Sequence, residues 1–202
     1  KNGNPILVIG TDPYFYNLSK EKWPQENESL TLLSTEIFQS INPFFVVILT
    51  PVVVNFFAFL RRKKKEPSTP AKIGWGLFVT AISTLLMLLA VLTSNNGTEK
   101  SSALWLVGTY AIITIGELFL SPMGLSLVSK ISPKRITGLM MGGWFLSTSI
   151  GNKLSGLISG LWDSFDNKAY FFLINFSGAL LSALAIFLMV KWLRRVVEEH
   201  SS

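Results

Sequence analysis

The residue best suited to chemistry is Glu117, a carboxylate near the middle of residues 101–129, which carry no other charge. A charge at the centre of a membrane helix costs roughly 2.5–3.5 kcal/mol or more, so it needs a partner or a function. Thr114 and Ser121 lie at helical steps from it and extend a polar stripe along one face. Pro122 follows and frees a backbone carbonyl one turn back. The pattern predicts a water-filled cavity, and a structural pairing of Glu117 with a Lys or Arg of another helix stays open.

Two other side chains in apolar stretches are candidates for binding. Asn42 lies beside Pro43 in an uncharged run of 24 residues, and it is equally suited to a ligand or a neighbouring helix. Trp144 lies about a third of the way along its stretch rather than at an interface, where tryptophans usually anchor. We expect it to be lipid-facing bulk or the wall of a cavity. Lys153 is a second charge within an apolar stretch, and its long stem can extend toward the interface.

A row of small residues at successive four-residue steps is typical of helices that pack closely. The row consists of Gly143, Ser147, Gly151, Ser155 and Ser159. It predicts close approach to another helix. A face that slides during a conformational cycle is the weaker alternative.

Several kinds of chemistry are excluded by composition. The chain has no cysteine and one histidine, His200, so thiol nucleophiles, disulfides, thiolate metal sites and His-cluster metal sites are not available. Asp163 and Asp166 form a short pair, but no base, nucleophile or metal ligand converges with them. We therefore expect no catalytic residue, no metal and no cofactor. Nucleic acid is not an expected partner either, because most basic residues flank apolar runs.

The elements that carry these residues are five apolar stretches. The 202 residues are 49% hydrophobic and 15% charged, with a mean hydropathy of +0.44. A bilayer core of roughly 30 Å requires about 20 helical residues. Five segments are long enough, so we predict an all-α membrane protein with five transmembrane helices at about 37–60, 73–94, 104–128, 137–162 and 169–190.

Loop charges predict the orientation of these helices. With a cytoplasmic C-terminus, the inner connections and tail carry twelve cations: Arg61, Arg62, Lys63, Lys64, Lys65, Lys72, Lys130, Lys134, Arg135, Lys191, Arg194 and Arg195. The outer loops carry two, Lys100 and Lys168. The positive-inside rule therefore favours a cytoplasmic C-terminus.

Three flanking segments complete the expected organisation of the chain. We expect residues 1–35 to be an external loop or the end of a preceding segment, and 196–202 a cytoplasmic tail after the five-helix region 36–195. The linker 61–70 contains two prolines that should stop any helix. Its five consecutive cations are expected to anchor the topology, with attraction of anionic lipid as the less favoured alternative.

Three motifs, in order, resemble the proton-coupled oligopeptide transporter family, a branch of the major facilitator superfamily. Residues 38–45 (FQSINPFF) resemble its eighth transmembrane helix, residues 104–126, with GELFLSPMGLS, its tenth, and residues 140–147 (MMGGWFLS) its eleventh. The resemblance covers about residues 36–195. It implies part of the C-terminal half of a twelve-helix fold, and thus a portion of a longer protein.

The resemblance also implies a function and its residues. The family takes up di- and tripeptides, driven by protons, through a central cavity between two halves. The residues matching Glu117 and Asn42 would recognise the peptide amino terminus, Trp144 would wall a side-chain pocket, and Ser121 and Ser147 would lie nearby. The paired-glutamate motif that couples protons in the family is not in this chain. The expected partners are therefore peptide, protons, the lipid bilayer and an N-terminal half, and the expected location is a bacterial inner membrane.

Two alternatives to a peptide symporter remain at this point. One is a major facilitator relative that carries another small solute, such as nitrate or a metabolite. The other is a membrane scaffold subunit without transport.

Overall fold

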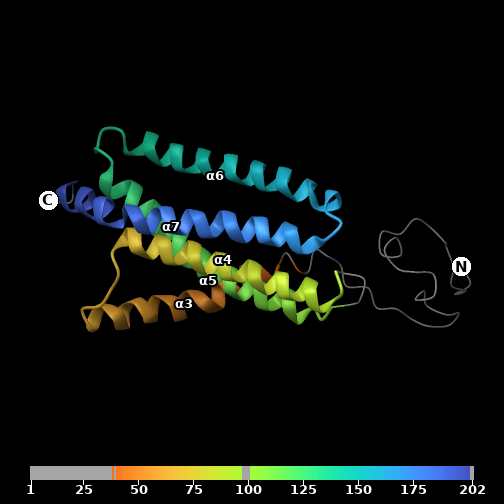
Figure 1. Ribbon diagram of the computed structural model, residues 1–202. Coiled ribbons are helices and arrows are strands. Elements are labelled where there is room, and N and C mark those ends of the chain that lie inside the picture. The colour runs from red at the N-terminus through yellow and green to blue at the C-terminus, as the bar shows by residue number, and fades with distance from the viewer. Residues whose placement is uncertain (1–37, 39, 97–100, 201–202) are drawn as a thin grey trace, which may run out of the picture.

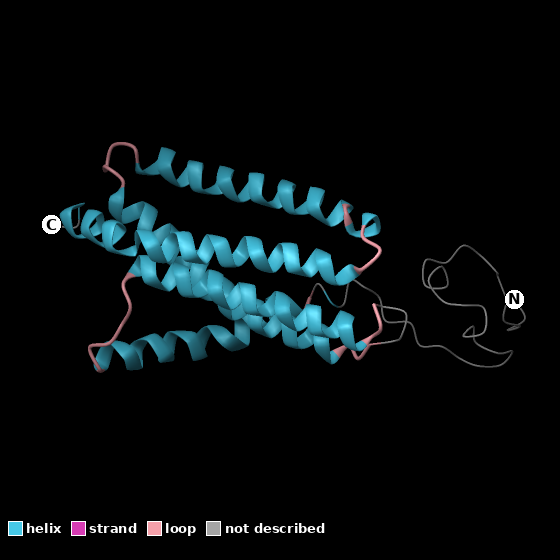
Figure 2. Ribbon diagram, viewed as in Figure 1, coloured by secondary structure: helices cyan, strands magenta, loops and turns pink. Residues whose placement is uncertain are grey.

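The computed structural model describes residue 38, residues 40–96 and residues 101–200, and these form five α-helices and one short 3-10 helix (Figures 1 and 2). In chain order they are α3 (Ile41–Arg62), α4 (Thr69–Thr93), α5 (Leu104–Ile131), α6 (Thr137–Gly160), the 3-10 helix η2 (Trp162–Ser164) and α7 (Lys168–His200). The prediction of an all-α chain with five helices is confirmed. The predicted external segment 1–35, the predicted helix start at 37, Lys100, and residues 201–202 of the predicted tail lie outside the described residues.

Four of these helices, α3, α4, α5 and α7, are long and apolar enough to cross a membrane. Of the described helices, α6 is the one that does not meet this standard, although the sequence pattern predicts five spans. It has 24 residues, so composition rather than length sets it apart. Ser147, Asn152, Lys153, Ser155 and Ser159 lower its hydropathy.

Two helices extend beyond the predicted membrane spans, each for a local reason. The helix predicted from residue 73 begins at Thr69, and Pro70 lies in its first turn instead of stopping it. Proline is accepted there because its missing N–H would have no helical partner. The last helix continues through the predicted tail to His200, since no Gly or Pro interrupts residues 191–200.

Helix α4 lies at the centre of the packing, between α5 and α7, while α3 packs on α5 (Figure 1). Its buried residues are mostly small: Ala81, Ser83 and Ala90 are almost inaccessible. The Ser83 hydroxyl is satisfied within α4, because it donates to the carbonyl of Thr80 at 2.6 Å. Small side chains in the core therefore let the neighbouring helices come close to α4.

The backbones of α4 and α5 approach each other closely at two glycines. A Cβ atom added to Gly116 would lie 2.5 Å from Oγ1 of Thr80 and 2.9 Å from the carbonyl oxygen of Gly76. A Cβ atom added to Gly76 would lie 2.8 Å from the carbonyl oxygen of Gly116. Only glycine fits at both positions, so the two backbones are in direct contact.

The predicted close packing of the small-residue row of α6 is wrong for the described part of the chain. No atom lies within 4 Å of a Cβ added to Gly143 or Gly151, and α6 has no buried residue. Figure 1 shows α6 along one side of the bundle. It touches α5 through the bulky side chain of Trp144, which holds the two backbones apart.

This arrangement predicts unequal effects of two glycine substitutions. Gly116→Ala should destabilise the protein by about 1–3 kcal/mol, because the added methyl group overpacks the contact with α4. Gly151→Ala is the matched control, and it should be neutral or stabilise the protein by up to about 1 kcal/mol, because alanine favours a helix and the added methyl group meets no atom. The measurement is thermal unfolding of the purified full-length protein. Equal effects of the two substitutions would contradict the close contact.

Candidate functional site

The centre of the site is a hydrogen bond between two helices. Nδ2 of Asn42, in the first turn of α3, donates to Oε2 of Glu117 in α5 at 3.1 Å. Both side chains are partly buried. A hydrogen bond to an ionised carboxylate is roughly twice as strong as one between neutral groups. The structure thus brings together two residues that the sequence singles out separately and that lie 75 positions apart.

The start of α3 explains how Asn42 reaches α5. Helix α3 begins at Ile41, so Pro43 lies in the first turn, where its missing N–H removes no helical hydrogen bond. Pro51, by contrast, is in the interior of the helix. The first turn lies beside the middle of α5, which holds Glu117 (Figure 1). Further along, Phe57 packs on Phe119 with ring centroids 4.8 Å apart.

Glu117 has no cationic partner among the described residues. Neither the Arg61–Glu66 pair nor the Lys72–Glu66 pair involves it. A structural pairing of Glu117 with Lys or Arg, which the sequence leaves open, is therefore absent from the described part of the chain. The carboxylate accepts a neutral amide hydrogen and keeps further capacity to accept hydrogen bonds.

The predicted polar stripe around Glu117 is only partly present. Thr114 is completely buried, and its hydroxyl donates to the carbonyl of Tyr110 at 2.7 Å, within its own helix. A cavity-facing role for Thr114 is therefore wrong, because the local hydrogen bond already satisfies it. Ser121, one turn beyond Glu117, is exposed. The polar part of this α5 face consists of Glu117 and Ser121.

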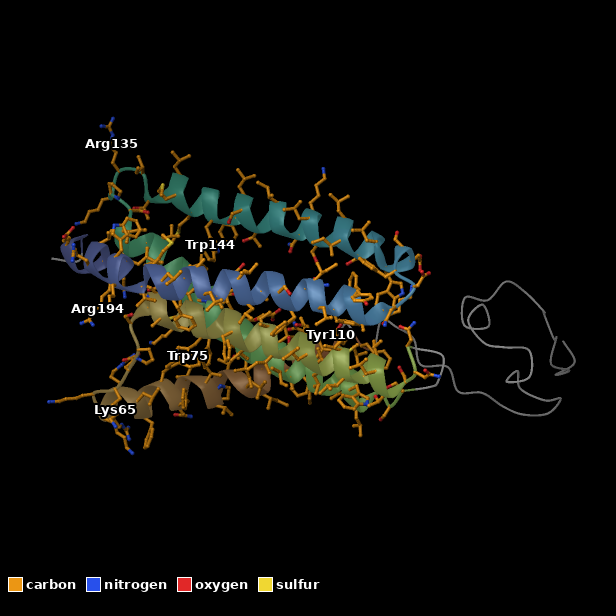
Figure 3. All side chains as sticks on the ribbon, viewed as in Figure 1. Lys65, Trp75, Tyr110, Arg135, Trp144 and Arg194 are labelled. Carbon is orange, nitrogen blue, oxygen red and sulfur yellow. The ribbon has the colours of Figure 1, made fainter. Side chains whose placement is uncertain are left out.

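Trp144 points from α6 toward the bundle and lies on α5 (Figure 3). A Cβ atom added to Gly124 would lie 2.1 Å from Cη2 of the indole, so the ring rests directly on the glycine backbone. Gly124 is seven residues after Glu117, two turns along the same face and about 10 Å away. The carboxylate and the indole therefore share one face of α5.

Ser147 is the last predicted site residue, and it does not join this cluster. It is exposed, and its hydroxyl donates to the carbonyl of Trp144 at 2.7 Å, within α6. Gly124 is the residue that the sequence analysis misses. Its signal is its position, since it lies on the helix face of Glu117, and glycine in a helix interior needs a packing reason.

Comparison with known proteins identifies the family of the chain. Residues 27–186 match the POT family (PTR2). A di-/tripeptide transporter of Lactococcus lactis is 37% identical over 150 residues, which are 74% of this chain and 29% of the relative.

Two solved structures are similar as well. The peptide transporter POT in complex with sulfate aligns with a TM-score of 0.73 and 29% identity, over 87% of this chain and 35% of that one. A POT family transporter in complex with 5-aminolevulinic acid aligns with a TM-score of 0.68 and 29% identity, over 77% of this chain and 31% of that one.

These matches cover most of this chain but only part of each relative. This chain spans about 30% of the length of the relatives that it matches. The matched residues cover α3 to α6 and more than half of α7. The predicted resemblance is therefore confirmed: the chain belongs to the POT family.

Proposed function

We propose that this chain is the C-terminal portion of a proton-coupled symporter of di- and tripeptides, in which Glu117 and Asn42 recognise the peptide amino terminus. The observation that carries the proposal is the hydrogen bond of the Glu117 carboxylate to Asn42, without a cation among the described residues. A partly buried carboxylate of this kind is suited to a ligand ammonium group, because it retains acceptor capacity and a net charge. The family membership supports the substrate class.

The other predicted residues receive secondary roles in this proposal. Trp144 forms a wall on the same α5 face as Glu117 and bounds the pocket for a peptide side chain. Ser121 and Ser147 are exposed and contribute hydroxyl groups near the path of the peptide. The proton-coupling groups belong to other parts of the transporter.

A second candidate function is the transport of another small amine. The structure of a POT family transporter with 5-aminolevulinic acid favours it, since that ligand also carries an amino group. Glu117 would recognise the amine in both cases. A comparison of uptake of dipeptides and of 5-aminolevulinic acid distinguishes the two.

We further propose that the protein lies in a bacterial inner membrane with its C-terminus in the cytoplasm. The four apolar helices and the bacterial relatives support the membrane location. The distribution of twelve cations against two supports the orientation, in which α6 crosses the membrane alongside the four apolar helices (Figure 1).

The orientation predicts the accessibility of single cysteines, which can be introduced into a chain without any native cysteine. Ser164→Cys in η2 should react with an impermeant thiol reagent from outside intact cells, and Lys134→Cys should react only after permeabilisation. Both positions are exposed, so burial does not limit either reaction. The reverse labelling pattern would overturn the orientation.

The role of Glu117 predicts a loss of peptide uptake in the full-length transporter. Glu117→Gln removes the charge and keeps the shape, so affinity for a free dipeptide should fall by about 30- to 4,000-fold, the equivalent of about 2–5 kcal/mol. The measurement is proton-driven uptake in proteoliposomes. Asp163→Asn, an equal change of charge at an exposed position, is the control and should have no effect.

Peptides with a blocked amino group make this experiment specific. They should bind poorly to the wild type and lose little more from Glu117→Gln, since the group that Glu117 recognises is already absent. Wild-type uptake by Glu117→Gln would contradict the proposal. An equal loss for free and blocked peptides would also contradict it.

The contact of Trp144 with Gly124 predicts a change of selectivity. Gly124→Ala forces the indole off α5, so the uptake ratio of dipeptides with bulky and small side chains should change by about tenfold or more. Gly138→Ala in α6 is the control, because no atom lies within 4 Å of its added methyl group. If Gly124→Ala changes the exposure of Trp144 and leaves selectivity unaltered, Trp144 does not bound the pocket.

A further inference from the structure

A second cluster of polar groups lies where α3 ends and α4 begins, away from Glu117. The Glu66 carboxylate accepts a hydrogen bond from Nε of Arg61 at 2.8 Å and one from Nζ of Lys72 at 2.5 Å. The Lys72 side chain is only 7% exposed. Hydrogen bonds from Arg61 and then Lys72 lower the pKa of Glu66 to about 2. The carboxylate is therefore ionised at neutral pH, and it offsets one of the two cations.

These groups line a pocket of about 410 Å³ that also reaches α5. Lys130 of α5 lines it as a third cation, and Thr69 and Ser126 contribute hydroxyl groups. No carboxylate among the described residues forms an ion pair with Lys130. The pocket thus holds three cations and one anion, a net charge of about +2. Cations with hydroxyl donors are suited to a phosphate group.

An apolar pocket of about 330 Å³ adjoins this basic pocket and shares Lys72 with it. Phe56 and Leu60 of α3, Trp75 of α4 and Phe119 of α5 line it. The stem of Lys72 connects the two pockets, since its Nζ lies 4.4 Å from the centre of the Phe57 ring. Figure 3 shows Trp75 between α3 and α4.

The apolar lining continues further along α3. A third pocket of about 240 Å³ shares Phe56 and Phe119 with the second and has Leu49, Val52 and Ile115 on its walls. A basic recess at the end of the helices is therefore followed by an apolar groove along apolar helices. The basic pocket and the apolar groove follow each other in the same order as the headgroup and the acyl chain of a phospholipid.

We propose that these pockets bind one anionic phospholipid, with its phosphate in the basic pocket and an acyl chain in the apolar groove that begins between α3 and α4 and continues between α3 and α5. The charge favours an anionic headgroup over a zwitterionic one. The four cations at 62–65, which follow Arg61 directly, add to the attraction of this end for anionic lipid. A soluble anion would use the basic pocket and leave the apolar groove without a role, so the pair of pockets points to lipid.

The test is lipid binding by the full-length transporter with spin-labelled phosphatidylglycerol and phosphatidylcholine of identical acyl chains. The wild type should restrict the motion of phosphatidylglycerol in preference to phosphatidylcholine. Lys130→Gln should lower this preference about fivefold, which corresponds to the contribution of one cation near the membrane surface to the binding of anionic lipid. Lys130→Arg should retain the preference. Lys134→Gln, a lysine close to the same end of α5 but outside the pocket, is the matched control and should lower the preference less than Lys130→Gln does.

A second measurement tests the acyl chain. Phosphatidylglycerol with bromine on the acyl chain should quench the fluorescence of Trp75 more strongly than the brominated phosphatidylcholine. The fluorescence of Trp75 is obtained as the difference between the wild type and Trp75→Phe. Displacement of the labelled lipid by millimolar inorganic phosphate would overturn the proposal in favour of a simple anion site. Equal quenching of Trp75 by both lipids would also overturn it. Quenching by neither lipid would overturn it as well, because protein would then cover the groove. Neither readout depends on peptide transport.

Discussion

The direct contact of α4 and α5 at Gly76 and Gly116 is the constraint on which the site depends. Consecutive residues of a helix point about 100° apart, so fixing Gly116 against α4 also fixes the direction of its neighbour Glu117. That direction leads away from α4 and toward the first turn of α3, where Asn42 donates to the carboxylate. A wider helix contact would let α5 rotate, and the hydrogen bond would lose its geometry. The hydrogen bond between α3 and α5 therefore rests on the glycine contact between α4 and α5.

Local hydrogen bonds allow this tight packing to include polar residues. The hydroxyls of Thr80, Ser83 and Thr114 each donate to a carbonyl three or four residues earlier in the same helix. They need no partner on another helix, so they fit between close backbones without an unsatisfied donor. Glu117 is different, because no carbonyl can satisfy a carboxylate. Its partner must come from another helix or from a ligand, and this difference separates the structural hydroxyls from the candidate site.

The sequence predicts the number and order of the helices well, since long apolar runs leave few alternatives in a membrane. It also identifies Glu117, because an isolated charge in such a run is rare. It fails where the outcome depends on a neighbour in space. The small-residue row of α6 suggests close packing, and yet the close backbone contact forms at Gly116, since α4 meets α5 through its backbone and α6 meets it through the side chain of Trp144. Periodicity likewise predicts that Thr114 faces a cavity, and only the packing of α5 shows it to be buried.

Helix α6 combines the two features that the apolar helices lack, a polar composition and a surface without buried residues. Within the described part of the chain, its main attachment to α5 is the indole of Trp144 on Gly124. An element held by few buried contacts is displaced at lower free energy than one packed on two sides, as α4 is between α5 and α7. The α5 face that carries Glu117 is therefore bounded on one side by the rigidly packed α4. On the other side it is bounded by α6, whose position depends on the side chain of Trp144. Under the proposed function, ligands of different size would be accommodated at the second boundary while the position of the carboxylate stays fixed.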